Sequence, residues 1–234
     1  MENYRTILDE QQAQRETAAF MSRVYAWMSL ALVITALVSL VTASTPAIFQ
    51  VIFGNRLIFY GLLIGEIALV VWLSAAIGRM SASQATLLYL GYSALNGLTL
   101  SVIFLVYTAG SIFSTFLITA GTFAAMSLYG YFTKRDLTSL GNLLLMALIG
   151  LIIASVVNIF WQNSTFYWIT TYAGVLIFTG LVAYDTQKIK NMNELGNEGT
   201  EEDRKEAIMG ALALYLDFIN LFLYLLRLFG SRRN

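Results

Sequence analysis

The sequence contains no cysteine and no histidine, and it has a single proline, Pro46. Without thiols or imidazoles the chain cannot form disulfides, bind zinc or haem through Cys or His, or carry thiol or Ser-His catalysis. Any metal site must consist of oxygen ligands, which favours calcium, magnesium or monovalent ions. We expect no cofactor, and we consider Ca²⁺ as a permeant or bound ion.

Charge is also scarce. Only 12% of the 234 residues are charged, about half of the roughly 25% that is typical of soluble domains. The formal net charge is zero, so nothing indicates a nucleic-acid partner. Mean hydropathy is high, at +0.68, and the lipid bilayer is the expected surrounding.

Charged residues are absent from three long stretches, namely 24–55, 80–133 and 137–184. A helix that crosses a bilayer needs about 20 apolar residues, so these stretches have room for one, two and two spans. The runs are continuous rather than alternating, which favours helices over β-barrel strands. The sequence thus predicts an all-α integral membrane protein with a seven-transmembrane helix bundle. Its spans are expected at about 24–44, 57–78, 84–106, 111–132, 141–161, 167–188 and 207–229.

The polar segments define the predicted organisation. Residues 1–22 form a polar segment without the order of a cleavable signal peptide, and 23–230 form a single domain. Within it, 190–206 is a polar, acidic loop that we expect to be mobile, and 231–234 form the tail. Ten of the 14 Lys and Arg residues lie on the side of the N-terminus and four on the other side. This bias predicts a cytoplasmic N-terminus and loop.

The last apolar stretch leaves two alternatives open. Its twenty apolar residues (207–226) fit a full crossing, which we favour and which makes seven spans. An odd number of spans, however, places the basic tail outside, against the charge rule. A segment that dips into the membrane and returns would make six spans and a cytoplasmic tail.

Three acidic residues fall inside predicted spans: Glu66, Asp185 and Asp217. A carboxylate at the bilayer centre costs roughly 2.5–3.5 kcal/mol even on insertion scales, and such groups usually face the bundle interior or a wet cavity. The plainer alternative is that each is a protonated, hydrogen-bonded structural group. Around Asp217 the last span carries a small or polar stripe at helical spacing, predicted to face protein or water while Leu, Ile and Phe cover the rest. The stripe consists of Gly210, Ala213, Asp217, Asn220 and Tyr224.

Asp185 is the natural partner for Asp217. Tyr184 and Gln187 beside it supply hydrogen-bonding groups, and a direct contact requires the sixth helix to continue to about Met192. Two carboxyl groups that meet in a low-dielectric site share a proton, so they would form a pH sensor without histidine. When both are ionised they repel one another or recruit a cation, and carboxylate oxygens suit Ca²⁺. Asp185 and Asp217 are therefore the predicted gate and the candidate calcium ligands.

Four segments resemble the Bax inhibitor family, also called the transmembrane Bax inhibitor motif family. They are LYLDFINLFLYLLRLFG (214–230), AYDTQKIK (183–190), KRDLTSLGN (134–142) and YSALNGLTLS (92–101), and the likeness covers residues 20–230. The resemblance implies that the last helix lies centrally among the other six. It also implies a proton-sensitive calcium leak with Asp185 and Asp217 as the sensor.

The resemblance extends to two further charged positions. The family glutamate of the second helix matches Glu66 in LLIGEIALVV. Family members also place an arginine near the end of that helix, which can lock onto the sixth-helix aspartate in the closed state. Arg79 is the only candidate here, although its spacing from Glu66 departs from the family pattern. The short polar ends resemble the bacterial type, which implies a multi-pass protein of the bacterial inner membrane.

Three functions compete. The first is a pH-sensitive leak for calcium or other cations, with calcium ions and protons as partners. The second is an intramembrane aspartyl protease, which Tyr184–Asp185 resembles; the Gly-x-Gly expected before Asp217 and the proline-containing loop are missing, so we expect no enzyme. The third is a non-conducting regulator that binds a membrane-bound quality-control protease, with the N-terminal segment as its handle.

Overall fold

The computed structural model describes residues 2–193 and 196–233, and for residues 2–10 the backbone only. Across these ranges the chain is helical, and the one strand-like feature is an isolated antiparallel bridge between Tyr107 and Arg232. Seven helices are long and apolar enough to cross a membrane, as the sequence predicted. The helices are α1 (Glu2–Ser44), α2 (Pro46–Gly54), α3 (Arg56–Ala76), η1 (Ile77–Arg79), α4 (Ala82–Leu100), α5 (Ile103–Val106), α6 (Ala109–Phe132), α7 (Thr138–Trp161), α8 (Ser164–Met192) and α9 (Glu201–Phe229).

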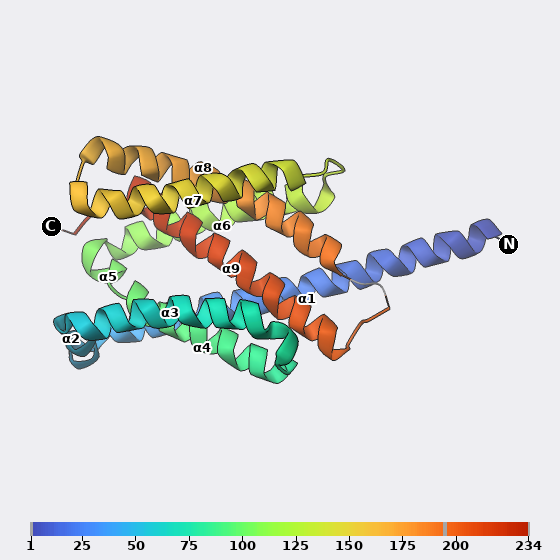
Figure 1. Cartoon of the computed structure of the whole chain (residues 1–234), viewed down its shortest axis with the longest axis horizontal. Helices are drawn as coiled ribbons and strands as arrows, with labels where there is room; N and C mark the ends of the chain where they lie inside the picture. Colours follow the sequence, from blue (N-terminus) through green and yellow to red (C-terminus); the bar gives the residue numbers. More distant parts are fainter. Residues whose placement is uncertain (1, 194–195, 234) are drawn as a thin grey trace. The chain divides into compact units, whose positions relative to one another are not determined.

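The chain divides into two compact units. Unit 1 comprises residues 1–105 and 189–215, and unit 2 comprises 106–188 and 216–234. Helices α8 and α9 each contribute to both, with the beginning of α9 in unit 1 and its second half in unit 2 (Figure 1). The residues predicted as a gate, Asp185 and Asp217, both belong to unit 2.

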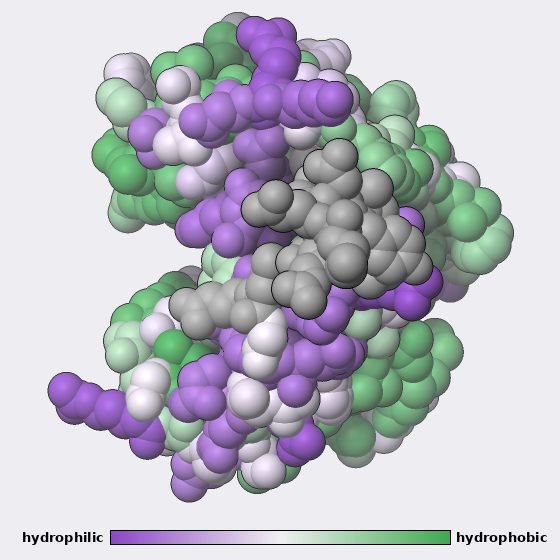
Figure 2. All heavy atoms as spheres, turned by 90° about the vertical axis from the view of Figure 1, so that its right-hand side faces the viewer, coloured by the Kyte–Doolittle hydropathy of each residue, from purple (hydrophilic) through white to green (hydrophobic). Residues whose placement is uncertain are grey.

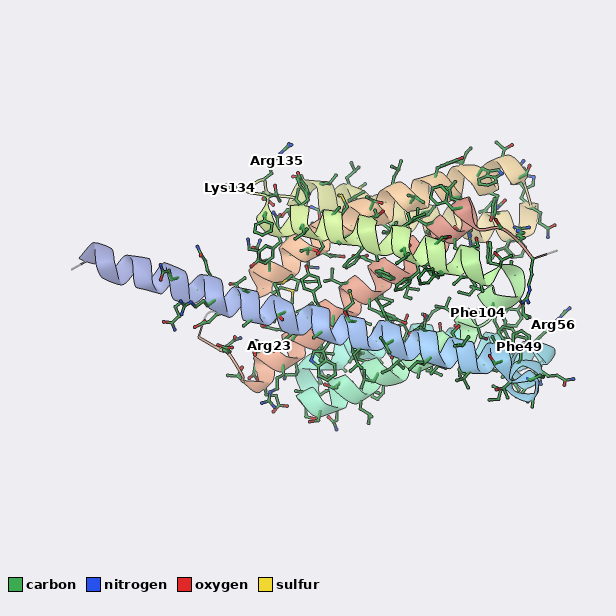
Figure 3. All side chains as sticks on the ribbon, turned by 180° about the vertical axis from the view of Figure 1, so that it is seen from behind. Arg23, Phe49, Arg56, Phe104, Lys134 and Arg135 are labelled. Atoms are coloured by element: carbon green, nitrogen blue, oxygen red, sulfur yellow. The ribbon has the colours of Figure 1, made fainter. Side chains whose placement is uncertain are left out.

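In unit 1, helix α1 lies beside α4, and α4 lies beside α3 (Figure 1). Gly97 of α4 permits the first contact, because a β-carbon there would lie 2.8 Å from the carbonyl oxygen of Thr35. Helix α4 begins with a capping box, in which Ser81 and Gln84 exchange side-chain and backbone hydrogen bonds, and such caps satisfy amides that the helix leaves free. Arg23 and Arg56 lie at opposite ends of this unit (Figure 3), as expected for charged residues that flank membrane spans.

Unit 2 is built around the contact between α8 and the second half of α9. Its apolar core is a cluster of buried side chains from α7, α8 and α9. Gly174 of α8 lies directly against the ring of Tyr224 on α9, so the two helices approach closely. The core residues are Leu151, Ile177, Phe178, Leu181, Leu221 and Leu225.

The last segment does not turn back, because α9 is one continuous helix from Glu201 to Phe229. Ser231 accepts a hydrogen bond from the backbone of Thr108 (3.1 Å) and donates one to Ser111 Oγ (2.7 Å), and Arg233 N donates to Val106 O (2.9 Å). The tail is thus joined to the connection at which α6 begins. The start of α9, by contrast, follows the C-terminal end of α8, and that end lies the whole length of α8 away from the α7–α8 turn. At about 1.5 Å per residue, the 29 residues of α9 are long enough for this. The re-entrant alternative is therefore wrong.

The α8–α9 loop is shorter than the sequence suggested. Helix α8 runs to Met192 and α9 begins at Glu201, so only 193–200 remain of the predicted loop 190–206, and 194–195 lie outside the described residues. The described part is anchored to unit 1. Gly196 N donates to Glu16 Oε2 (2.9 Å), and Asp203 at the start of α9 pairs with Arg23. Figure 2 shows hydrophilic side chains gathered on the face that carries these connections, as a membrane–water boundary requires.

Helix α9 is the most buried span. In its most apolar window 67% of the residues are buried, compared with 6% for α7, as the resemblance implied for a central helix. Asp217 is buried, at 5% exposure, as its place in the polar stripe predicted. Leu214, Phe218 and Leu221 on the other faces of the helix are equally buried, so these are packing faces.

Candidate functional site

The two gate aspartates meet. Asp185 on α8 and Asp217 on α9 are joined by a side-chain hydrogen bond. Helix α8 continues to Met192, about two turns beyond Asp185, which is the length that the contact required. A hydrogen bond between two carboxyl groups needs a proton on one of them, because two carboxylates have no donor. That the pair shares one proton stays a prediction.

The pair lies in a dry surrounding. Asp217 is only 5% exposed, and Asp185 is half-buried. The second oxygen of Asp217, Oδ2, has no hydrogen-bonding partner among the described residues. On the same helix as Asp185, Lys188 is close enough to interact with its carboxyl group, but its side chain is exposed. Burial and the neighbouring carboxyl group of Asp185 therefore both disfavour a charge on Asp217.

The residues around Asp185 orient it by holding α8 against α6 and α7. The ring of Tyr184 lies against Gly141 on α7. The hydroxyl of Thr186 shares a hydrogen bond of 3.0 Å with Ser127 on α6. Three successive residues of the AYDTQ motif thus contact three different helices, and Asp185 between them has little freedom to turn.

Gln187 extends this arrangement to the α6–α7 connection. Its Oε1 accepts from Leu137 N and its Nε2 donates to Arg135 O, each at 2.8 Å. Both atoms satisfy backbone groups next to the start of α7, where a helix leaves its amides unpaired. In the same connection, hydrogen bonds from the side chain and the backbone amide of Thr138 lower the pKa of Asp136, which is exposed. Figure 3 shows Lys134 and Arg135 at this end of the unit.

Glycine at one position sets the distance between α6 and α8. A β-carbon at Gly130 would collide with the carbonyl group of Ala183, two residues before Asp185. Gly121 on the same helix has no neighbouring atom within 4 Å of an added β-carbon. Close approach next to the aspartate pair therefore depends on Gly130, and Gly121 provides a matched control.

The remaining predicted polar residues of unit 2 have local contacts. Asn220 Nδ2 donates to Leu216 O (2.8 Å) within its own helix. Among the described residues, no group of three or more acidic, His or Cys side chains gathers that could hold a metal ion. The pair alone offers fewer oxygens than the six to eight that Ca²⁺ takes, so water or backbone oxygens would complete any calcium site.

Glu66 lies in unit 1 and belongs to a second polar cluster. It is 8% exposed on α3 and has two partners on α4: Thr99 Oγ1 at 2.7 Å and Asn96 Nδ2 at 3.3 Å. Tyr215 on α9 donates to Asn96 Oδ1 (3.2 Å) and shares a hydrogen bond of 2.7 Å with Thr35 on α1. The cluster thus links four helices through buried polar groups.

Hydrogen counting indicates which form of Glu66 fits this cluster. Thr99 Oγ1 also lies 3.0 Å from Asn96 O, and a hydroxyl has only one hydrogen for its two acceptors. If Glu66 carries a proton, it donates to Thr99, and Thr99 then donates to Asn96 O. A protonated Glu66 therefore satisfies its own two contacts and both contacts of Thr99. Sequence analysis missed this cluster as a unit, although Asn96 and Thr99 lie in the segment YSALNGLTLS that carried the resemblance.

Arg79, the candidate for a lock onto Asp185, lies in the 3₁₀ turn η1 at the end of α3 and is exposed. It belongs to unit 1 and Asp185 to unit 2. A pairing of the two stays a prediction.

Comparison with known proteins identifies the relatives. The sequence model of the family described as inhibitor of apoptosis-promoting Bax1 matches residues 17–234. The inner membrane protein YbhL of Escherichia coli is 55% identical over 215 residues, 92% of each chain. An uncharacterized protein of Borreliella burgdorferi is 47% identical over 215 residues, covering 92% of this chain and 93% of its own. An uncharacterized membrane protein of Streptococcus pyogenes is 37% identical over 213 residues, with 90% and 92% covered.

Proposed function

This chain belongs to the Bax inhibitor-1 family and is a multi-pass inner membrane protein, and from this premise we propose that it is a pH-sensitive leak for calcium and other cations. The observation that carries the proposal is the hydrogen bond between Asp185 and Asp217, which lie on two different membrane-spanning helices. Intramembrane acids of this kind mark ion and proton pathways.

The proposed mechanism follows from the shared proton. While the proton is present, it ties α8 to α9. When pH rises and the proton leaves, the hydrogen bond is lost and two negative charges face one another at close range. The helices then separate, or a cation takes the place of the proton, and a hard divalent ion suits two carboxylates. Gating and cation binding are thus alternative states of one pair.

Flux measurements on protein reconstituted in liposomes test this proposal. In Asp217→Asn the amide group can donate to Asp185 without a shared proton, so the tie persists at every pH. We expect this variant to show, across the pH range, the calcium flux that the wild type shows only at low pH. Asp136→Asn removes an exposed carboxyl of the same unit and should leave the pH profile unchanged. A wild-type pH profile in Asp217→Asn would overturn the proposal.

We also propose that the N-terminus is cytoplasmic. With seven spans, ten Lys and Arg residues lie on the N-terminal side of the membrane and four lie on the other side. This excess of positive charge favours a cytoplasmic N-terminus. Accessibility labelling of a single cysteine introduced at Ser231 or at Asn197 would decide it. Labelling of the first from outside, and of the second only after permeabilisation, is the expected result.

A second candidate function is a regulator of a membrane-bound protease that conducts nothing. The observation in its favour is that the polar N-terminal segment continues α1 as one helix from Glu2, which offers a partner a regular surface. Deletion of residues 1–18 separates the two functions. A leak should keep its calcium flux without the segment, whereas a regulator should lose its effect on the protease.

A further inference from the structure

A polar cavity lies where α7 ends and α8 begins. It has a volume of about 650 Å³, and its lining combines one guanidinium group with uncharged hydrogen-bonding side chains. No carboxylate lines it among the described residues. The lining residues are Asn158, Gln162, Asn163, Ser164, Tyr167 and Arg232.

The orientation of the amide groups favours donors in this cavity. Asn158 Oδ1 accepts from Asn163 N (3.1 Å), and Asn163 Oδ1 accepts from Phe166 N (3.1 Å). Because both side-chain oxygens are used within the turn, the two Nδ2 groups remain as donors. The cavity therefore presents hydrogen-bond donors and a positive charge, which is the complement of an anion such as phosphate.

Arg232 has no acidic partner among the described side chains. It is held instead by Tyr107, through a backbone bridge and a side-chain hydrogen bond. Burial raises the pKa of Tyr107, so its hydroxyl stays neutral. A second guanidinium, that of Arg227, lies 5.5 Å from the ring centre of Tyr167 in a cation–π contact. The cavity thus holds the positive charge of Arg232 without a counter-ion from the described part of the chain, and the charge of Arg227 lies behind its Tyr167 wall.

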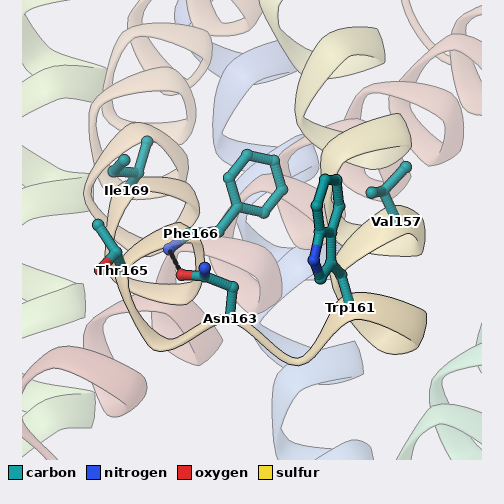
Figure 4. Close-up of a pocket in the computed structure, with 6 residues that line it drawn as sticks. All are labelled: Val157, Trp161, Asn163, Thr165, Phe166 and Ile169. Carbon is teal, nitrogen blue, oxygen red and sulfur yellow. Dashed lines mark hydrogen bonds between the residues drawn. The ribbon is translucent and has the colours of Figure 1, made fainter.

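An apolar pocket adjoins the polar cavity. It has a volume of about 290 Å³ and lies between the side chains of α7 and α8, with Trp161 facing Phe166 across the turn (Figure 4). Val157 and Ile169 complete its apolar wall, and Asn163 lines both cavities. Trp161 is 78% exposed at the end of a membrane span, which is where Trp and Tyr gather at the membrane–water interface.

We propose that these two cavities bind one phospholipid with an anionic headgroup, whose phosphate occupies the polar cavity beside Arg232 and whose acyl chain follows the apolar pocket beside Trp161 and Ile169. The occupant is amphipathic because the cavities differ in polarity and share a wall. It is anionic because the lining of the polar cavity holds the guanidinium group of Arg232 and no carboxylate among the described residues. A zwitterionic headgroup would bring its own ammonium group towards Arg232 and should bind less well.

Native mass spectrometry of the detergent-solubilised full chain, titrated with phosphatidylglycerol or phosphatidylcholine, tests the headgroup. We expect one phosphatidylglycerol molecule to bind more tightly than phosphatidylcholine. Arg232→Gln should weaken phosphatidylglycerol by about fivefold, since a basic residue near an anionic lipid contributes about that factor. Arg56→Gln removes an exposed arginine in unit 1 and should change nothing. Equal binding by Arg232→Gln and wild type, in protein shown to be folded by its unchanged Tm, would overturn the proposal.

A second variant pair tests the acyl chain independently of Arg232. Ile169→Ser lines the apolar pocket and should weaken phosphatidylglycerol, whereas Ile149→Ser, an exposed position of α7 away from the pocket, should not. Glycerol phosphate and inorganic phosphate at the same concentrations should compete poorly, because they lack the chain. Displacement of the lipid by either anion at equal concentration would show that the cavity takes a free anion, and would refute the lipid assignment.

Discussion

Replacing Arg23 by alanine should destabilise the protein far more than replacing its exposed partner Glu198. Arg23 Nη2 lies 2.8 Å from Oδ1 and 2.9 Å from Oδ2 of Asp203, and its Nη1 lies 3.3 Å from Glu198. The side chain of Asp203 is 1% exposed, whereas Glu198 is 53% exposed. The two acids thus face the same guanidinium from different surroundings.

The expected magnitudes follow from what each substitution leaves behind. Without Arg23, the buried carboxylate of Asp203 keeps the backbone amide of Gly199 (2.9 Å) as its nearest donor, and removal of one partner of a buried pair costs about 3–5 kcal/mol. Asp203→Ala leaves an arginine that is 34% exposed and can turn to water or to Glu198. Its cost should be about 1.5–3 kcal/mol, the range for a lost charged hydrogen bond. Glu198→Ala should cost at most about 1 kcal/mol, as a surface pair does.

Unfolding free energies of the three variants, measured by denaturant titration in mixed micelles, give this order directly. A double-mutant cycle between Arg23 and Asp203 isolates the coupling from other effects of each substitution. If Arg23→Ala proves no more destabilising than Glu198→Ala, the pair does not anchor the start of α9, and the reasoning is refuted.

Two further predictions concern the buried polar groups and the helix contacts. Glu66→Gln should be as stable as wild type, because the amide reproduces the hydrogen-bonding pattern of a protonated carboxyl group. Glu66→Leu should lose about 1–3 kcal/mol of unfolding free energy, because it leaves the Asn96 amide unpaired. Thermal unfolding in detergent at two pH values measures both variants, and a less stable Gln variant would contradict the hydrogen count. Gly130→Ala should cost about 1–3 kcal/mol by overpacking against Ala183 and should alter the pH response of calcium flux, while Gly121→Ala should do neither. Equal Tm and flux in the two alanine variants would count against the role of α6.

Much of the fold could be predicted from where the charges are missing. Uncharged stretches of 32, 54 and 48 residues (24–55, 80–133 and 137–184) have few structural solutions other than spanning helices. The contact between Asp185 and Asp217 could also be predicted, because helical spacing and topology made it depend only on the length of α8. That length, the continuation of α8 to Met192, is not encoded in hydropathy, since residues 188–192 are mostly polar.

Contacts between helices were harder to predict. Gly121 with Ala125 and Gly150 with Ala154 have the spacing typical of helix contacts, yet neither glycine has a neighbour within 4 Å of an added β-carbon. Gly130 does, and nothing in its local sequence distinguishes it. Small-residue spacing defines a face of one helix, but the identity of the partner depends on the whole bundle.

Shared polar groups were missed for a similar reason. Asn96 and Thr99 lie on α4 and Tyr215 lies on α9, more than 100 residues further along the chain, and each alone is an ordinary residue of a membrane span. Only the arrangement around Glu66 gives them a common role. The polar stripe on α9 indicated that Asp217 faces inward, but it could not indicate that the apolar faces of the helix are buried as well.

The shared proton between Asp185 and Asp217 is tested most directly by infrared difference spectroscopy of the reconstituted protein between low and high pH. In a Glu66→Gln background, which removes the buried carboxyl group of the second polar cluster, we predict that one carboxylic-acid band disappears as pH rises. The band should be absent in Asp217→Asn and retained in Asp136→Asn. A spectrum in which no carboxylic-acid band responds to pH, or one in which the band persists in Asp217→Asn, would contradict the shared proton.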